Sequence, residues 1–188
     1  MRFFAVLFLC LCVLTPGALF GQGQTYIEGF FGSTSIDVPG GFNVDDETAF
    51  GFWGGYAFSS NFAFEVGYGN YGEFEDSFDD GFEVFTISET LTSFNVGIKG
   101  IVPLEGGVFL HGKIGMAFWE VEQELTISDG VETFSDSFSI DDEDIYIGFG
   151  ASYMISDTAY ATVDYLMVDL DKLNIDASVL SIGIGAIF

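Results

Sequence analysis

His111 is the single histidine of the chain, and it lies in the segment FLHGKIG. A histidine that an acid orients can act as the general base for a serine, which is the chemistry of lipid-hydrolysing sites. No serine lies two residues from His111, and the segment begins just after a short connection. The pattern favours an interior or rim histidine, and we expect no enzymatic activity.

Acidic side chains gather in three clusters, DDE, EDSFDD and DDED, over 45–47, 75–80 and 141–144. Carboxylate oxygens are ligands that Ca²⁺ prefers, but none of the clusters has the spacing of an EF-hand loop or of a nonapeptide repeat. The clusters therefore favour a solvated, charged surface over a metal site. We expect neither a metal nor another cofactor.

The composition combines strong charge with strong hydrophobicity. The 188 residues include 29 Asp and Glu against four Lys and Arg, for a formal net charge of −25, while aromatic residues make up 18% of the chain. Charged and hydrophobic side chains must therefore be segregated in space. A field of this sign disfavours nucleic acid and anionic headgroups as partners unless divalent cations bridge them.

The first residues, MRFFAVLFLCLCVLTPGALFGQGQ, are typical of a secretory signal peptide. Arg2 precedes an apolar run over 3–14, and small residues follow. The run is shorter than the roughly 18–20 residues of a helix that spans a bilayer. We expect a signal peptide over 1–23, with cleavage near 21–23, and one mature domain over 24–188. The only two cysteines lie in the signal peptide, so the mature domain would contain no disulfide.

The mature chain alternates large apolar residues with small or polar ones at a period of two, which is typical of β-strands. In FAFEVGYG, over 62–69, Phe, Val and Tyr alternate with Ala, Glu and Gly. The last segment, VLSIGIGAIF, alternates in the same way and ends on Phe188. Eight strands are predicted, over 26–38, 48–58, 62–71, 86–102, 108–127, 138–155, 158–168 and 177–188.

The connections between these strands alternate in length. SSN, PLEGG and SDT are short, whereas the other connections are long and acidic. This alternation is typical of outer-membrane barrels. A soluble secreted barrel would need a polar outer face on each strand, and these strands do not supply one. The sequence predicts an all-β fold, an eight-stranded antiparallel transmembrane β-barrel with short periplasmic turns and long acidic extracellular loops, its large apolar residues facing lipid.

Two of the long connections contain Asp-Gly pairs, at 80–81 and 129–130, which are typical of hairpin turns. Alternation continues around the second pair in ELTISDGVETF. We therefore expect the strands predicted over 86–102, 108–127 and 138–155 to continue past the membrane as an ordered sheet.

Several segments together resemble the OmpA-like and OmpX-like family of eight-stranded outer-membrane barrels, over roughly the whole mature length. They are AFGFWGGYAFSSNFAFEVGYGNYG, NVGIKGIVPL, LHGKIGMAFW, GASYMISDTAYATVDY and the aromatic C-terminus. The resemblance implies a cell outer-membrane location, surrounding outer-membrane lipid, and an insertion machinery that recognises the C-terminal strand through Phe188.

The resemblance also implies charged pairs inside the barrel. Glu65 in FEVGY matches the family's interior glutamate, Lys99 in GIKGIVP its interior lysine and Lys113 in HGKIG its interior arginine. Glu65 and Lys99 lie on neighbouring predicted strands, and neither charge could face hydrocarbon without a large cost. Ser152 and Thr162 stand where the family has charged residues, so only half of that network is expected here.

Two functions remain open at this point. One is a non-enzymatic outer-membrane anchor that presents an acidic surface for structural, adhesion or interaction roles, and the other is a small ion-conducting pore. Plugging of the lumen by Trp53, Asp164 and the three charged residues above would distinguish the two. We expect a monomer, and the ligand or host partner at the surface is not identified by the sequence.

Overall fold

The computed structural model describes residues 23–38, 42–43, 46–79, 84–128, 133–170, 172–173 and 175–188. The signal peptide expected over 1–23 lies almost entirely outside these residues. The strands are β1 (Thr25–Val38), β2 (Phe42–Asn43), β3 (Glu47–Ala57), β4 (Phe62–Asp79), β5 (Val84–Pro103), β6 (Val108–Ser128), β7 (Thr133–Ser156), β8 (Ala159–Leu170) and β9 (Ile175–Ile187). Among the described residues, no helix has the length and hydrophobicity to cross a membrane.

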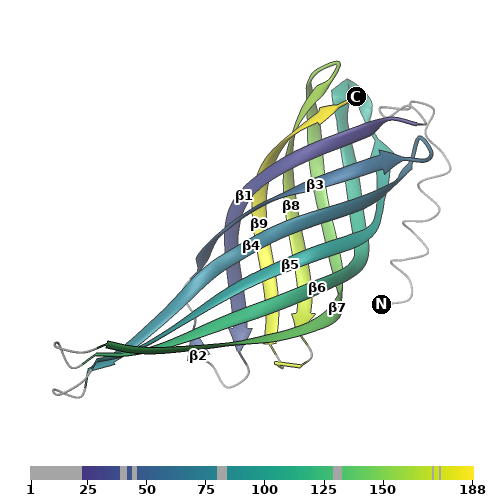
Figure 1. Ribbon diagram of the computed structural model, residues 1–188. Helices are drawn as coiled ribbons and strands as arrows, with labels where there is room; N and C mark the ends of the chain where they lie inside the picture. Colours follow the sequence, from purple (N-terminus) through teal and green to yellow (C-terminus); the bar gives the residue numbers. More distant parts are fainter. Residues whose placement is uncertain are drawn as a thin grey trace.

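Eight of the strands close into an antiparallel barrel (Figure 1). Neighbours in the chain pair from β3 to β9, and β1 pairs with both β3 and β9, whereas β2 is a short ribbon paired with β1. At the closing seam Tyr26 pairs with Ile187, and the backbone N–H of Phe188 donates to the Thr25 carbonyl at 2.8 Å. Closure satisfies the strand-edge hydrogen bonds that lipid cannot. The predicted fold class is confirmed.

Short turns join the strands at one end of the barrel, as predicted. The β3–β4 turn is held by Ser59, whose Oγ accepts hydrogen bonds from the backbone N–H groups of Asn61 at 3.3 Å and Phe62 at 3.0 Å. Between β5 and β6 lies a single 3₁₀ turn, η1 (Glu105–Gly107), in which Gly106 and Gly107 have φ of 75° and 80°. These left-handed conformations favour glycine, which explains the PLEGG connection.

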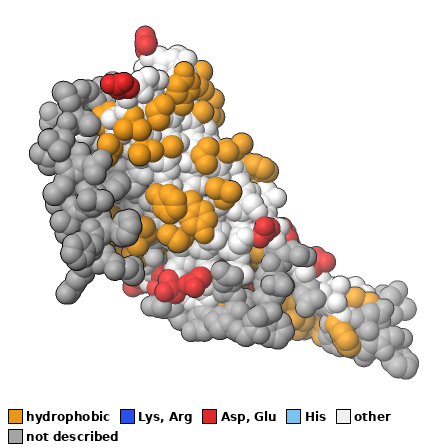
Figure 2. Space-filling view, turned by 180° about the vertical axis from the view of Figure 1, so that it is seen from behind, with side chains coloured by type: hydrophobic (Ala, Val, Ile, Leu, Met, Phe, Trp, Pro, Cys, Tyr) orange, Lys and Arg blue, Asp and Glu red, His pale blue; other side chains and the backbone are white. Residues whose placement is uncertain are grey.

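The outer wall of the barrel is apolar, and the small or polar members of each alternating pair point inward. Phe64 and Val66 are 56% and 48% exposed, whereas Glu65 between them is 1% exposed. Figure 2 shows hydrophobic side chains over the wall, with acidic side chains above and below them. This distribution suits a wall surrounded by hydrocarbon.

Four neighbouring strands, β4 to β7, continue well past the others as a narrow protruding sheet (Figure 1). The apolar outer row of β7 runs from Ile145 to Ile155, which matches the roughly 9–11 residues of one bilayer crossing. Beyond this row β6 and β7 remain paired as far as Ser128 and Thr133. At about 3.3 Å per residue, this part extends roughly 40 Å along the strands from the wall. The expected continuation of three strands is therefore present.

The prediction that a strand ends at Tyr71 was wrong, because β4 continues to Asp79. The pairing of β4 with β5 shifts between Asn70 and Glu73, and Gly72 at this bulge has φ of 113° while its N–H donates to Asn70 Oδ1 at 3.0 Å. A bulge inserts one extra residue and changes the phase of the alternation. Much of the expected acidic loop is therefore strand, and the expected Asp-Gly tips at 80–81 and 129–130 lie outside the described residues.

A pair of glycines lets two strands approach each other beneath a large aromatic side chain. Gly97 of β5 pairs directly with Gly115 of β6. A Cβ atom on Gly115 would lie 2.2 Å from the Val96 carbonyl oxygen, and one on Gly97 would lie 2.2 Å from the Tyr146 hydroxyl. Tyr146 is fully buried over this pair, so the glycines form the floor of its site.

We expect Gly115→Ala to lower the free energy of unfolding by about 3 kcal/mol, the upper end of the usual cost of overpacking, because the new methyl group meets backbone that cannot move aside. Gly54→Ala is the matched control, since a Cβ there meets nothing within 4 Å. Denaturant unfolding of both variants in lipid would check this. Equal stabilities of the two variants would show that the strands can separate at no cost.

Candidate functional site

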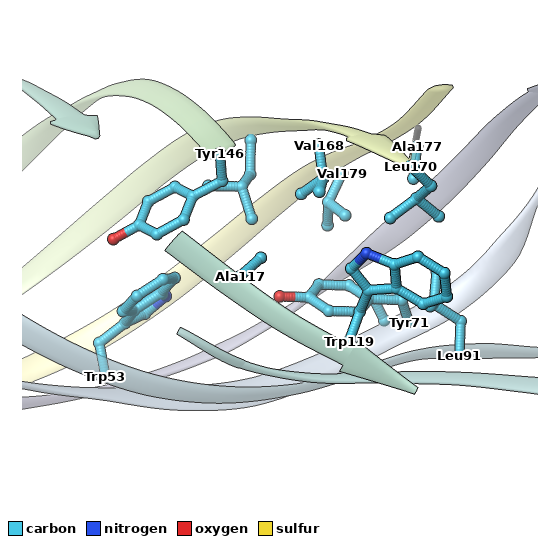
Figure 3. Close-up of a cluster of buried hydrophobic side chains, with 12 residues drawn as sticks. Trp53, Tyr71, Leu91, Ala117, Trp119, Tyr146, Val168, Leu170, Ala177 and Val179 are labelled. Atoms are coloured by element: carbon cyan, nitrogen blue, oxygen red, sulfur yellow. The ribbon is translucent and has the colours of Figure 1, made fainter. Parts of the chain in front are cut away.

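The lumen is filled in three layers. At the short-turn end lies an apolar cluster, formed by Tyr26, Ala57, Ala63, Ile101, Phe109, Tyr160 and Ile187. Toward the protruding sheet lies a second apolar cluster (Figure 3), which includes Trp53, Tyr71, Leu91, Ala117, Trp119, Tyr146, Leu166, Val168, Leu170, Ala177 and Val179. Between the two clusters lies a layer of ionisable side chains, which we call the charged layer, formed by Glu28, Glu65, Lys99, His111, Lys113 and Asp164.

Lys99, from β5, lies on the side of the charged layer that faces the short turns, and it is fully buried. Its Nζ lies 3.3 Å from Glu65 Oε1 and 3.6 Å from Glu28 Oε2, and 5.1 Å from the centre of the Tyr26 ring. The two carboxylates come from β4 and β1, so one ammonium group joins three strands. The structure thus brings together the Glu65–Lys99 pair that the sequence places on adjacent strands.

Lys113, from β6, occupies the centre of the same layer. Its Nζ lies 3.3 Å from Asp164 Oδ1, 3.6 Å from Glu28 Oε1 and 3.9 Å from Glu65 Oε1, and 4.5 Å from the centre of the Trp53 ring. All lysine–carboxylate separations in the layer exceed the about 2.7–2.9 Å of a charge-assisted hydrogen bond. Both ammonium groups are therefore held by Coulomb attraction from several carboxylates at once.

Two tyrosines at the short-turn end hydrogen-bond to the same carboxylates. The Tyr26 hydroxyl donates to Glu65 Oε1 at 2.6 Å, and the Tyr160 hydroxyl donates to Glu28 Oε2 at 2.9 Å. The two rings stand edge to face with centres 6.5 Å apart. Buried charges are stabilised by pairing and by hydrogen bonds, and the two carboxylates have both.

His111 lies inside the barrel beside an acid and a serine. Its Nε2 is 2.7 Å from Asp164 Oδ1, and its Nδ1 is 3.4 Å from Ser152 Oγ. The residues next to His111 in the chain do not indicate this serine, because it lies on the neighbouring strand β7. The Ser152 hydroxyl donates to Thr162 Oγ1 at 3.0 Å, and the Thr162 hydroxyl donates to Asp164 Oδ2 at 2.6 Å. The serine hydroxyl is thus part of a hydrogen-bonded chain through Thr162 to Asp164, and Ser152 is 3% exposed.

Glu28 is the interior charge that the sequence analysis missed. It is 1% exposed and contacts both buried lysines. The available signal was its position: it alternates in phase with Tyr26 and Phe30 in YIEGF, and it lies away from the acidic connections. With His111 included, the charged layer is larger than the half network expected from the sequence, and the hydroxyl groups of Ser152 and Thr162 hydrogen-bond beside it.

Two spaces among the described side chains of the lumen are very small. One cavity of about 10 Å³ lies among side chains of the second apolar cluster, including Tyr71 and Trp119. Another of about 20 Å³ lies beside Lys113, Asp164 and Trp53. A single water needs roughly 10–15 Å³ on the same measure. Each space therefore has room for about one water, and neither provides a water-filled path.

The outer face of the protruding sheet is acidic. It continues, along the same strands, the rows of side chains that face lipid on the barrel wall. It presents the exposed side chains of Glu73, Glu75, Glu120, Glu122, Glu124, Asp141 and Glu143. Lys172 lies beside β7, with its Nζ 2.7 Å from the Asp141 carbonyl oxygen and 3.7 Å from Oδ2 of Asp142, whose side chain is on the other face of the sheet. Within the described ranges, no group of three or more His, Cys, Asp or Glu is arranged to hold a metal ion.

Known proteins share this architecture. Ail of Yersinia pestis is 14% identical over 89% of this chain and 99% of its own, with a TM-score of 0.60. Neisserial surface protein A is 12% identical over 88% and 99%, with a TM-score of 0.57, and the N-terminal barrel of OprF from Pseudomonas aeruginosa is 18% identical over 90% and 100%, with a TM-score of 0.52. No curated protein matches the sequence significantly.

These likenesses establish the fold, and the sequence itself establishes the family. Residues 3–188 match the model of the outer membrane protein beta-barrel domain, which is nearly the whole chain. The closed barrel, its apolar wall and the short turns at one end agree with that match. The chain therefore belongs to the outer membrane protein beta-barrel domain family, and it is a protein of the cell outer membrane.

Proposed function

We propose that the chain is a non-enzymatic anchor that holds an acidic β-sheet outside the cell for adhesion or interaction. The sealed lumen is the observation that carries the proposal. Two apolar clusters enclose a layer of paired charges, and the cavities measured among them each fit about one water. An eight-stranded barrel of this kind is filled by its own side chains.

The protruding sheet supports the second half of the proposal. A membrane anchor does not require four strands to continue past the membrane. The acidic outer face of these extensions has no counterpart on the lipid-facing wall of the barrel. In barrels of this type the short turns face the periplasm and the longer segments face the exterior. We therefore place the sheet outside the cell, with export through a signal peptide over 1–23 and a monomeric barrel as parts of the same proposal.

The charge of the surface restricts the kind of partner. Ail has also been crystallised with the heparin analogue sucrose octasulfate, and that structure is 15% identical to this chain with a TM-score of 0.61. A polyanion suits this chain poorly, because its formal net charge is −25 and its sheet is lined with carboxylates. We propose a partner with positive charge instead.

An enzymatic role is not part of the proposal. Ser152, His111 and Asp164 come together, but the serine hydroxyl donates to Thr162 Oγ1 at 3.0 Å and its Oγ lies 3.4 Å from His111 Nδ1. A nucleophile needs a base that takes its proton and a space for the substrate. Ser152 is buried between the two apolar clusters, so the trio supports packing of the lumen.

We expect the purified, refolded protein to show no steady current in planar bilayers, because its lumen is too narrow for a column of water. A large porin with an aqueous channel, reconstituted in the same bilayers, is the positive control. A reproducible, steady current from the wild-type barrel would overturn the anchor proposal and establish the pore instead.

A further inference from the structure

The protruding sheet has a second face, which continues the lumen-facing rows of β4 to β7. We call it the inner face, and its large side chains are Phe74, Phe78, Ile87, Val121, Leu125, Ile127, Phe134, Phe138 and Ile140. Phe78, Phe134 and Phe138 are 67%, 64% and 54% exposed. Polarity is thus inverted beyond the membrane, where the apolar side chains lie on the inner face and the acidic ones on the outer face.

An apolar surface of this kind in water needs an explanation. Exposed apolar patches of several hundred Å² on soluble surfaces are uncommon and mark interaction sites. The surrounding leaflet does not explain this one, because the inner face lies on the opposite side of the sheet from the lipid-facing wall. Its exposure is therefore consistent with a binding surface for a partner in solution.

The inner face ends at a cavity beside the barrel mouth. The cavity has a volume of about 250 Å³, and its walls include Phe74, Phe138 and Ile140 from the sheet and Leu173 and Ile175 from the β8–β9 segment. This space is more than ten times that of either cavity in the lumen. It can accept one large apolar side chain, the kind of anchor that dominates binding at an interface.

Acidic side chains flank the apolar stripe on the same face. Asp136 pairs with Leu125, Asp142 with Trp119, and Glu89 with Gln123, so all three point to the inner side. Among the described residues, Lys172 is the only Lys or Arg outside the lumen. A ligand for this face therefore needs apolar groups along its length and positive charge at its edges.

We propose that the inner face binds a cationic amphipathic peptide segment, with its apolar side on the phenylalanines and its Lys or Arg side chains near Asp136 and Glu89. Asp142 is left out because it is already paired with Lys172. The inference rests on the proposed function only in requiring the sheet to stand outside the membrane. The apolar part of the face extends roughly 20 Å along the strands, the length of a helix of about 13 residues. A second copy of this chain fits poorly, because each copy carries a formal charge of −25.

Binding can be measured with a designed peptide of Leu and Lys whose leucines lie on one face of a helix. The full chain is placed in nanodiscs of phosphatidylcholine, so that the lipid itself attracts no cation, and empty nanodiscs correct for binding to lipid. Fluorescence anisotropy of the labelled peptide gives Kd. We expect saturable binding at one site, and clearly weaker binding of a peptide with the same composition but scrambled order.

Two sets of variants test which face is used. Phe134→Ser with Phe138→Ser removes apolar surface from the inner face, and we expect Kd to rise by about tenfold or more, given the usual value of a buried Phe. Asp136→Asn should raise Kd by a smaller factor. Glu122→Gln with Glu124→Gln, on the outer face of the same sheet, is the matched control and should change Kd by less than about twofold. Heat-modifiable gel mobility confirms that each variant is folded.

Three outcomes would overturn the inference. The first is an unchanged Kd for the phenylalanine variant, and the second is equal binding of the scrambled peptide, since either would mean attraction by charge alone. The third is dimerisation of the wild-type protein that the phenylalanine variant abolishes, which would make a second copy the occupant. If the peptide does not bind and the wild-type barrel carries no current, only this inference fails and the proposed anchor function stands. A steady current would overturn the anchor function, whether or not the peptide binds.

Discussion

Lys99→Met should lower the free energy of unfolding of the refolded barrel by about 3–5 kcal/mol, the usual cost of removing one partner from a buried ion pair. The lysine is fully buried, and its Nζ lies within 3.6 Å of both Glu28 and Glu65. Met fills a similar volume but leaves these two carboxylates with Lys113 as their only close cation. Denaturant unfolding in lipid vesicles measures the change.

Two further variants make the test specific: a control substitution of a surface lysine, and a double variant. Lys172→Met is the matched control, because Lys172 and its partner Asp142 are 48% and 40% exposed, and a pair of this kind is usually worth less than about 1 kcal/mol. Adding Glu65→Gln to Lys99→Met removes one stranded charge and should recover part of the loss, a coupling that only neighbours show. Equal stabilities of Lys99→Met and Lys172→Met would mean that water solvates the interior charges.

The barrel could be predicted from the sequence because its signals are local. Alternation within each strand shows which residues face lipid, and the lengths of neighbouring connections show how the strands are joined. FAFEVGYG is an example: its large residues lie outside and Glu65 lies inside, as the pattern indicates. Neither signal depends on knowing which strands, far apart in the sequence, lie side by side in the barrel.

The contents of the lumen could be predicted only in part, because alternation gives the face of a residue but not its neighbours. Glu28 meets Lys99 and Lys113 only because β1 closes the barrel opposite β5 and β6. Ser152 reaches His111 through the register of β6 and β7, in which Phe109 pairs with Ser152. Both contacts depend on strand order and register, which a single strand does not encode.

The length of the protruding sheet was underestimated for a different reason. Gly72 introduces a bulge, and the alternation resumes beyond it in EFEDSF with its phase changed. A pattern of strict period two stops at such a point, although the strand does not. The inner face was missed with it, because Phe74 and Phe78 belong to the part beyond the bulge.

Phe188→Ser should reduce the amount of folded barrel in the outer membrane severalfold, because the terminal aromatic is our candidate for the signal that the insertion machinery recognises. Phe188 is 74% exposed at the short-turn end. Its backbone hydrogen bonds with Thr25, at 2.8 and 3.3 Å, close the seam without help from the side chain. Quantification of heat-modifiable protein in outer-membrane fractions measures the effect.

Phe31→Ser separates recognition from hydrophobicity. Phe31 is 60% exposed on the lipid-facing wall of β1, so its loss removes similar apolar surface, worth about 1.5–3 kcal/mol per Phe side chain, without touching the terminus. If both variants refold equally well in vitro and only Phe188→Ser is depleted in cells, the loss lies in delivery or insertion. Equal depletion of the two variants would reduce Phe188 to one more aromatic residue of the wall, and normal levels of Phe188→Ser would exclude a signal at this position.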